Sequence, residues 1–332
     1  MAKGWTAESV LELARGYQVA VVLMAAAELD VFTRLKRRPQ GWRRLADEMG
    51  ADIRATRILL DALAAIGLLE KHDYEYQLPP GLEEVLAADA PASVLPMLRH
   101  QANCHRRWTQ LAQVVKNGRP AERELSFLGE GADTESFIRA MHVVSAPVAD
   151  ELVASLGPPE FTHVLDVGGG PGTWTIALLK ARPEARATLF DLPQVIPIAR
   201  EYVQRAGLAG RVTFAGGDFA KDPLPEGADL AWVGAIIHMN SRDENRALYV
   251  KVRKALAPGG RILIRDVLMD ETRTAPPGGA LFAVNMLVST PGGQTYTFAE
   301  VQEDLSAAGF DKVALAHKGT MMDSVVEAVA PE

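Results

Sequence analysis

Glycines at alternate positions follow a short apolar run near the middle of the chain. Val-Leu-Asp-Val at 164–167 leads into Gly-Gly-Gly-Pro-Gly at 168–172, and an apolar helical pattern continues over 173–181. Glycine is needed where a side chain would block the close approach of a ligand or forbid the backbone angles of a turn. The order of strand, glycine turn and helix therefore predicts an α/β fold with a ligand bound at the turn.

Two classes of ligand compete for such a turn. A dinucleotide fingerprint has glycine at its first, third and sixth positions, but the sixth position counted from Gly168 is Thr173. Glycine instead occupies Gly168, Gly170 and Gly172, and Asp166 lies two residues before the first of them. A carboxylate there suits a cationic ligand and would repel a pyrophosphate. The pattern Asp-x-Gly-x-Gly-x-Gly resembles the first motif of class I S-adenosylmethionine-dependent methyltransferases, and this resemblance implies S-adenosylmethionine as the cofactor.

Size and composition restrict the remaining possibilities. The chain has 332 residues, enough for two domains, and 48% of them are hydrophobic. A net charge of −7 does not suit a protein that coats nucleic acid or an anionic membrane. The single cysteine, Cys104, excludes a disulfide framework and a cysteine zinc site, and no histidine spacing predicts a metal. We find no apolar run near the roughly 20 residues of a membrane span and no signal-peptide pattern, so we expect a cytoplasmic protein.

The first 90 residues or so are predicted to be helical and to end in a short hairpin. Leu11 to Ala27 is apolar on most faces, which indicates burial between elements or between subunits. Gly50 is expected to end one helix and Asp52 to cap the next. Leu68 to Leu78 has the pattern of a hairpin. Helix, turn, helix and hairpin together are typical of a winged helix.

A winged helix raises the alternative of a DNA-binding regulator. The helix that would read DNA carries Arg54 and Arg57 beside Asp52 and Asp61. Surfaces that bind phosphates are normally much more basic. We therefore expect no nucleic-acid partner, and interpret residues 1–92 as a dimerisation domain that forms a homodimer.

The rest of the chain is predicted as a helical connector at 93–158 and an α/β domain at 159–332. Strands and helices alternate from Thr162 onward, which indicates a parallel sheet with crossover helices. We expect seven strands, at 163–167, 187–191, 212–215, 230–235, 261–267, 312–317 and 324–329. Only a short turn separates the last two, so they are expected to pair antiparallel. The predicted fold class is α/β, with a seven-stranded Rossmann-like methyltransferase sheet, parallel except for one strand, after an N-terminal all-helical winged-helix domain.

Acidic and aromatic residues end the second and third strands of this sheet. Open parallel sheets bind ligands at the carboxyl ends of their strands. Asp191 ends the second strand, followed by Leu192, and its carboxylate suits the two ribose hydroxyls. Asp218 and Phe219 end the third, and suit the amino group and ring of an adenine. Capping of a helix by Asp191 and a turn role for Asp218 are the structural alternatives.

Downstream motifs extend the resemblance to nearly the whole chain. Asp-Leu-Pro at 191–193, Gly-Asp-Phe at 217–219, the His238 segment, Pro-Gly-Gly at 258–260 and Asn-Met-Leu at 285–287 occur in order. The chain is similar to small-molecule O-methyltransferases with an N-terminal winged-helix dimerisation domain. That resemblance implies that His238 is the general base, a task for which histidine suits neutral pH. It also implies that Asp266 is the carboxylate orienting this base.

Departures from the family pattern occur around the same histidine. A second family acid is expected just after Pro-Gly-Gly at 291–293, but the stretch 294–297 contains no carboxylate. Met239 and Asn240 stand where the family has Asp-Trp, and Gly234 stands where a lysine is expected. A thiol or an activated carbon needs less help from a base than a phenol does. Methylation of sulfur or carbon therefore stays open beside methylation of a hydroxyl.

The connector and the helix that follows the fifth strand supply candidates for the acceptor pocket. Helical spacing places Arg99, Asn103 and Arg106 on one face of the connector. This face suggests a carboxylate-bearing acceptor, although a solvated basic face is the simpler interpretation. The substrate-binding candidates are Arg99, Asn103, Arg106, Met141, His142, Asn285, Met286 and Tyr296.

Overall fold

The computed structural model describes residues 4–157 and 160–332, and its contacts divide the chain into two compact units. The first comprises the chain up to His105 together with Glu124–Val143; the second comprises Arg106–Arg123 together with Val144–Glu332. The chain passes between the units inside two helices, after His105 and after Val143, and in a loop after Arg123. The predicted domain boundaries at 92 and 158 stay predictions, and the second one lies outside the described residues.

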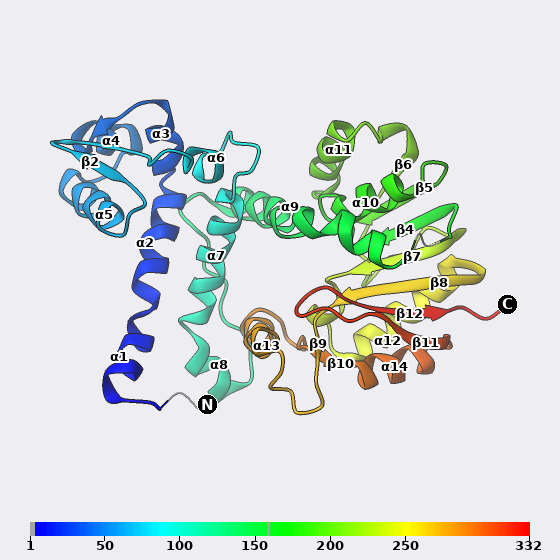
Figure 1. Ribbon diagram of the computed structural model, residues 1–332. Coiled ribbons are helices and arrows are strands. Elements are labelled where there is room, and N and C mark those ends of the chain that lie inside the picture. The colour runs from blue at the N-terminus through cyan, green and yellow to red at the C-terminus, as the bar shows by residue number, and fades with distance from the viewer. Residues whose placement is uncertain (1–3, 158–159) are drawn as a thin grey trace. The chain divides into compact units, whose positions relative to one another are not determined.

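The first unit is helical with one small sheet (Figure 1). In β1-β3-β2 order, this antiparallel sheet joins Gln40–Gly41, Glu75–Gln77 and Glu70–His72. The hairpin is thus where the sequence predicts it, whereas the two-residue β1 is unpredicted. The helices begun in this unit are α1 (Ala7–Arg15), α2 (Tyr17–Glu28), α3 (Val31–Arg37), α4 (Trp42–Met49), α5 (Ile53–Ala65), α6 (Glu83–Leu86), α7 (Leu95–Trp108) and α9 (Glu130–Ser155).

Local sequence explains where the helices of this unit stop and start. Gly50 ends α4 in the left-handed conformation, at φ 61°, which glycine adopts without a steric penalty. The Asp52 carboxylate accepts a hydrogen bond from the Ala55 amide and so caps α5. Both features are as predicted. Between these helices lies a core that includes Phe32, Leu45 and Tyr76.

Helix α1 and the first turn of α2 leave most of their apolar surface uncovered in the single chain. No residue of α1 is buried, and Leu13 and Tyr17 expose 69% and 57% of their surfaces. The stretch Ala7–Glu28 is one candidate membrane span among the described residues, being 22 residues long with a mean hydropathy of 1.4. The expectation that no apolar run approaches spanning length is therefore wrong for this stretch, whose apolar window is only 17% buried.

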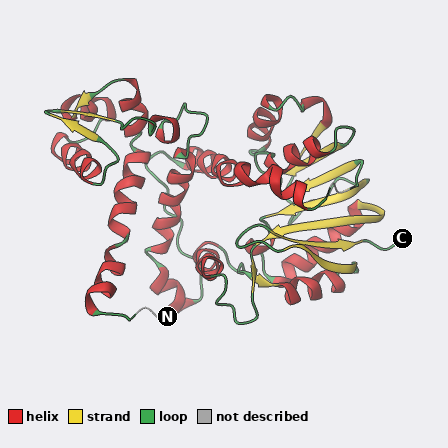
Figure 2. Cartoon of the chain, viewed as in Figure 1, coloured by secondary structure: helices red, strands yellow, loops and turns green. Residues whose placement is uncertain are grey.

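A seven-stranded sheet forms the centre of the second unit (Figure 2). Its order is β11-β12-β8-β7-β4-β5-β6. The strands are β4 (His163–Val167), β5 (Arg186–Asp191), β6 (Val212–Gly216), β7 (Ala228–Gly234), β8 (Leu256–Asp266), β11 (Asp311–His317) and β12 (Ser324–Val329). Only β12 runs against the others, since it pairs antiparallel with both β8 and β11. All seven predicted strands and the antiparallel hairpin are confirmed.

Helices cover both faces of this sheet (Figure 1). One face packs against the end of α9, α10 and α11, and the other against α12 and α14. The remaining elements are α8 (Leu111–Asn117), α10 (Thr173–Ala181), α11 (Ile196–Arg205), η1 (Ala209–Arg211), η2 (Ile237–Met239), α12 (Arg242–Ala255), β9 (Leu268–Met269), α13 (Pro277–Ser289), β10 (Tyr296–Thr297) and α14 (Phe298–Ala307). The predicted cofactor and catalytic residues lie at the carboxyl ends of β4, β5, β6, β7 and β8 or in the connections that follow these strands.

Candidate functional site

The turn between β4 and α10 requires its alternating glycines. Gly168, Gly170 and Gly172 all have positive φ, at 67°, 54° and 80°, a region that L side chains rarely adopt. A Cβ on Gly168 would lie 2.5 Å from Ile236 Cδ1, whereas one on Gly170 would meet nothing within 4 Å. Gly169, which sequence reasoning passed over, has no room either, since its Cβ would lie 2.7 Å from Leu189 Cγ. The turn is a backbone surface that a ligand can approach closely.

Asp166 lies beneath this turn. Its side chain is buried and accepts a 2.5 Å hydrogen bond from the Thr175 hydroxyl on α10. Burial raises the pKa of Asp166 to about 7, an effect opposed by the Thr175 hydrogen bond and reinforced by Asp191. A nearby cation would stabilise the ionised carboxylate and lower this pKa, which is consistent with the cationic ligand that the sequence predicts.

Asp191 joins the end of β5 to the glycine turn. One carboxylate oxygen accepts a 2.7 Å hydrogen bond from the Gly170 amide, and the other a 2.7 Å bond from the Leu192 amide. Burial raises the pKa of Asp191. The bonds show that Asp191 braces the turn, and each oxygen keeps a lone pair for a further donor such as a ribose hydroxyl. Leu192 is 38% exposed beside it.

The end of β6 only partly matches its predicted role. Asp218 accepts a hydrogen bond from the Ala220 amide and pairs with Lys221 at 2.9 Å. The hydrogen bond from Lys221 lowers the pKa of Asp218. Both contacts are those of a turn aspartate, the structural alternative noted from the sequence, and the predicted role of Asp218 toward the adenine stays a prediction. Phe219 lies at the glycine turn, its Cε1 3.7 Å from where a Gly168 Cβ would be.

His238 and Asp266 meet in a buried pair at the carboxyl ends of β7 and β8. Nδ1 of His238 lies 2.9 Å from both carboxylate oxygens of Asp266, and the residues expose 6% and 1% of their surfaces. Asp266 also accepts a 2.8 Å hydrogen bond from the Val267 amide. The pairing leaves Nε2 as the imidazole nitrogen able to accept a proton.

Phe282, on α13, is a site residue that sequence reasoning missed. Its ring meets the His238 imidazole edge-on, with centroids 4.8 Å apart and planes at 84°. The signal was present, because Phe282 lies three residues before the predicted Asn285, and such residues share a helix face. The His238 imidazole is thus held by a carboxylate at Nδ1 and by an aromatic ring beside it.

The absence of the expected family lysine at Gly234 has a packing explanation. A Cβ on Gly234 would lie 2.6 Å from Nε1 of Trp232, because the indole covers this position. Trp232 in turn stacks on Trp174, with ring centroids 5.1 Å apart, and Arg265 lies 4.3 Å over the Trp174 ring. Two indoles fill the space beside the strand end.

Comparison with known proteins places this geometry in a family. The family model described as an O-methyltransferase domain matches residues 108–311, and the O-methyltransferase dimerisation domain matches residues 11–87. The chain belongs to the O-methyltransferase family. It therefore transfers the methyl group of S-adenosylmethionine to a hydroxyl group of a small molecule, and the N-terminal segment is a dimerisation domain rather than a separate regulator.

Individual relatives of this methyltransferase include bacterial and animal enzymes. It is 34% identical to the tetracenomycin polyketide synthesis 8-O-methyl transferase of Streptomyces glaucescens, over 92% of this chain and 91% of that one. It is 32% identical to a 3-hydroxy-5-methyl-1-naphthoate 3-O-methyltransferase of Streptomyces sahachiroi, over 91% and 89%. Human N-acetylserotonin methyltransferase, solved in complex with S-adenosylmethionine, superposes with a TM-score of 0.82 at 27% identity, covering all of both chains.

The predicted acceptor-binding residues of the methyltransferase differ in their burial and in their hydrogen-bond partners. Asn285 receives a 2.9 Å hydrogen bond from the Trp108 indole on α7. Tyr296 is buried in the core and donates a 2.5 Å hydrogen bond to the Asn240 carbonyl, and Met286 is also buried. A lining role for Tyr296 is contradicted, since its hydroxyl is already used inside the core.

Four of the candidates belong to the first unit. Arg99 donates to the Ala27 carbonyl at 3.0 Å and pairs with Asp30 at 3.6 Å, so the carboxylate that it binds is one of its own chain. Burial lowers the pKa of His142. The roles predicted for Asn103, Met141 and His142, and for Arg106 at the start of the second unit, stay predictions.

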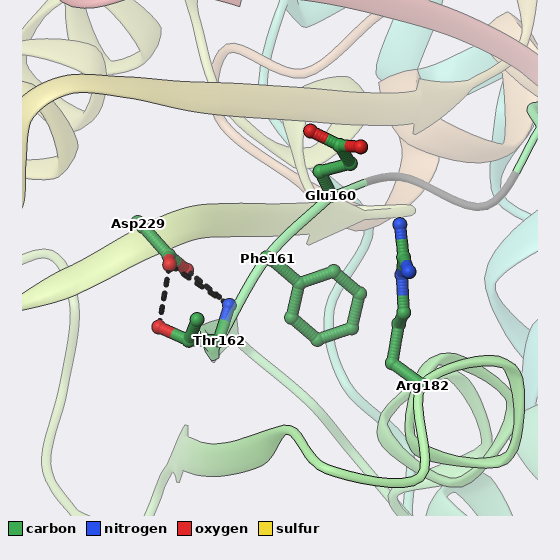
Figure 3. Close-up of a pocket in the computed structure, with 5 residues that line it drawn as sticks. All are labelled: Glu160, Phe161, Thr162, Arg182 and Asp229. Atoms are coloured by element: carbon green, nitrogen blue, oxygen red, sulfur yellow. Dashed lines mark hydrogen bonds between the residues drawn. The ribbon is translucent and has the colours of Figure 1, made fainter.

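A separate recess lies beside the amino ends of β4 and β7, and Figure 3 shows the residues that line it. It has a volume of about 340 Å³, and Asp229 accepts hydrogen bonds there from the amide and hydroxyl of Thr162. Thr162 and Asp229 stand at the amino ends of β4 and β7, whereas open α/β sheets bind ligands at the carboxyl ends. The recess is therefore not the catalytic site. Among the described residues, no group of three or more His, Cys, Asp or Glu side chains is placed to hold a metal ion.

Proposed function

We propose that this methyltransferase methylates a hydroxyl of a small aromatic molecule, with His238 as the general base and Asp266 as the residue that orients it. The observation that carries the proposal is the buried contact of Nδ1 with both Asp266 oxygens. A histidine held by a buried carboxylate keeps one tautomer and stabilises the imidazolium that forms when it takes a proton.

The chemistry divides between the cofactor and the chain. S-adenosylmethionine supplies a methyl group bonded to a positively charged sulfur. Nδ1–H of His238 donates to Asp266, so Nε2 accepts the hydroxyl proton while the acceptor oxygen forms its bond to the methyl carbon and the sulfur–carbon bond breaks. The sulfur keeps the bonding electron pair and becomes neutral. Positioning of donor and acceptor supplies much of the rate enhancement in such reactions.

The cofactor fits the cradle formed at the ends of β4, β5 and β6. Gly168, Gly170 and Gly172 expose backbone, and we assign the methionyl part of the cofactor to them, the ribose hydroxyls to Asp191, and the adenine to the surface of Leu192 and Phe219. Buried Asp166 lies beneath the site, where a bound cation would favour its ionised form over the neutral form that burial favours. Asp218 contributes through its turn rather than by direct recognition.

The side chains of Asn285 and Phe282 on α13 suit an aromatic acceptor that carries a carbonyl group near its hydroxyl. The Trp108 indole is only a donor, so it fixes the Asn285 amide with Oδ1 toward Trp108. The NH2 group of Asn285 is left to donate to an oxygen of the acceptor. Phe282 supplies an apolar face beside the base. The two Streptomyces relatives are named as O-methyltransferases of tetracenomycin polyketide synthesis and of a hydroxynaphthoate, which favours this class and favours oxygen over sulfur or carbon.

The uncovered surface of α1 and of the first turn of α2 supports a homodimer. A family dimerisation domain matches residues 11–87, and the exposed apolar surface of Ala7–Glu28 lies largely inside it. Burial of such surface between two copies removes it from water and is strongly favourable. A dimer accounts for this helix without a membrane, so we assign the methyltransferase to the cytoplasm. Cell fractionation tests that location, and recovery in the membrane fraction would overturn it.

Release of S-adenosylhomocysteine with a panel of acceptors tests the proposed function. The panel pairs 2-naphthol and a hydroxynaphthoic acid with a thiol and a keto acid of similar size. We expect turnover with the hydroxyl compounds and a loss of about 10²–10⁴ in kcat in His238→Ala, with affinity for S-adenosylmethionine unchanged. Turnover confined to the thiol or keto acid, or an unchanged kcat in His238→Ala, would overturn the proposal.

A further inference from the structure

The backbone on which His238 stands is a short 3₁₀ turn, η2, rather than a regular strand or helix. Such turns have few internal hydrogen bonds of their own. In η2 the Met239 amide donates to the Ile236 carbonyl at 3.0 Å and the Asn240 amide to the Ile237 carbonyl at 3.3 Å. The position of the imidazole therefore depends on what holds this turn from outside.

Asn245, on the first turns of α12, contacts the turn on both sides of the histidine. It is 2% exposed, and its Nδ2 donates a 2.9 Å hydrogen bond to the Ile237 carbonyl. Its Oδ1 accepts a 3.1 Å bond from Nδ2 of Asn240. One amide thus ties the residue before the base to a residue just after it, and only an amide side chain supplies both a donor and an acceptor of this size.

The element that carries Asn245 is firmly placed. Ser241 and Glu244 form a capping box at the start of α12. Further along, Arg242 and Arg246 both pair with the buried Asp304 of α14, at 2.7 Å and 2.6 Å. Asn245 therefore bonds to the η2 turn from a helix that is fixed independently of it.

The segment from Gly293 to Tyr296, which includes the stretch where the family has its second acid, also contacts the turn. A Cβ on Gly293 would lie 2.5 Å from the His238 carbonyl oxygen and 2.8 Å from that of Met239. Within this segment, the Tyr296 hydroxyl donates a hydrogen bond to the Asn240 carbonyl. Burial raises the pKa of Tyr296 to about 12, so the hydroxyl keeps its proton and stays a donor. This segment supports the backbone of the turn where relatives are expected to place a carboxylate.

We propose, on the basis of the base role proposed for His238, that Asn245 is a positioning residue that keeps Nδ1 of His238 on Asp266 and Nε2 toward the acceptor. Asn245 acts through the Ile237 carbonyl and does not touch the reacting atoms. Because the imidazole has one carboxylate partner instead of two, the orientation of its ring depends on the backbone beneath it. A displacement of about 1 Å in a catalytic group costs roughly 100-fold in rate.

The test compares two variants of Asn245 on two acceptors. Asn245→Asp keeps the shape and the acceptor atom but loses the donor, and Asn245→Ala loses both. The acceptors are 2-naphthol, which is un-ionised at neutral pH and needs a base, and a dinitrophenol that is already ionised. We expect kcat on 2-naphthol to fall about 10- to 100-fold in both variants, while kcat on the ionised phenol stays within about 2-fold. The dissociation constant for S-adenosylmethionine should not change.

A matched control separates positioning from general loss of packing. Val252 is fully buried on the same helix and is remote in sequence from the turn. Val252→Ala should lower the melting temperature and affect both acceptors equally. An equal loss on both acceptors in the Asn245 variants, or wild-type kcat on 2-naphthol in Asn245→Ala, would overturn the proposal.

Nitrogen-15 NMR of labelled histidine supplies a readout that needs no turnover. In the wild type, His238 should be the Nδ1–H tautomer, and in Asn245→Ala its two ring nitrogens should shift toward a mixture. An unchanged spectrum would contradict the positioning role. His238→Ala, measured alongside, distinguishes the failure of one proposal from the failure of the other. An unchanged kcat in His238→Ala would remove the base role of His238 itself. A large loss of kcat in His238→Ala, with no effect of Asn245→Ala, would remove only the positioning role of Asn245.

Discussion

Nδ1 of His238 lies 2.9 Å from each carboxylate oxygen of Asp266, and neither side chain reaches solvent to any large extent. Asp266→Asn keeps the shape but offers an amide NH2 to the same nitrogen, which favours the opposite tautomer. We expect kcat to fall by about 10²–10⁴ with little change in cofactor affinity. Steady-state kinetics and calorimetry measure the two quantities. Equal turnover by Asp266→Asn and the wild type would show that Asp266 does not orient the base.

Asp166 should make stability depend on pH. Its carboxyl ionises near 3.8 in the unfolded chain and near 7 when folded, so the folded state binds the extra proton between these values. The free energy of unfolding should therefore fall, by up to about 4 kcal/mol, as pH rises from about 4 to about 7. Asp166→Asn still accepts from Thr175 and should remove this slope. Denaturant unfolding at several pH values compares the two proteins, and parallel profiles would contradict the assignment.

Gly168→Ala and Gly170→Ala should differ although both glycines have positive φ. Alanine at 170 meets no neighbour, so it should cost about 1–2 kcal/mol in folding stability from backbone strain alone. Alanine at 168 also collides with Ile236, which raises the cost to about 2–5 kcal/mol. Adding Ile236→Ala to Gly168→Ala should recover part of the loss. Thermal unfolding checks the order, and equal costs at the two positions would refute it.

Leu13→Glu and Tyr17→Glu should convert a dimer into a monomer. Both residues are exposed on α1 and α2, and a charge buried between two copies would be unpaired. Size-exclusion chromatography with light scattering at micromolar concentration gives the mass. Val250→Glu, on the exposed face of α12, serves as the control and should stay dimeric. A wild-type monomer would defeat the homodimer proposal.

Trp108→Phe should weaken recognition of acceptors with a neighbouring carbonyl. Phenylalanine keeps an aromatic ring but loses the N–H that fixes the Asn285 amide. We expect KM for an ortho-hydroxy aryl ketone to rise about 5- to 10-fold, and KM for the matching phenol without the ketone to change little. A similar rise for both compounds would point to a general packing effect.

The sequence predicts much of this arrangement because local patterns determine it. The alternating glycines permit the positive φ angles that the turn needs, and the period of the apolar residues marks each strand of the main sheet. Long-range contacts account for the differences. Asp218 has a lysine three residues away, and Arg99 pairs with Asp30, in the turn between α2 and α3 far back in the chain. Nothing local distinguishes those partners from a ligand.

Two of the missed residues left a trace in the sequence. Asn245 occupies the apolar face of its helix, in series with Leu248, Tyr249 and Val252, and a polar residue on such a face is buried and needs partners. Phe282 shares a helix face with the predicted Asn285. Their targets, a backbone carbonyl and an imidazole, lie on other elements and come within reach only when the sheet forms.

The indole that covers Gly234 makes positions 232 and 234 interdependent. A lysine introduced at 234 alone would collide with Trp232, and a smaller residue at 232 alone would leave Trp174 without its stacking partner and open a cavity. A route from this chain to the lysine-bearing arrangement of its family, in the laboratory or in evolution, must therefore change position 232 first and cross a less stable intermediate sequence.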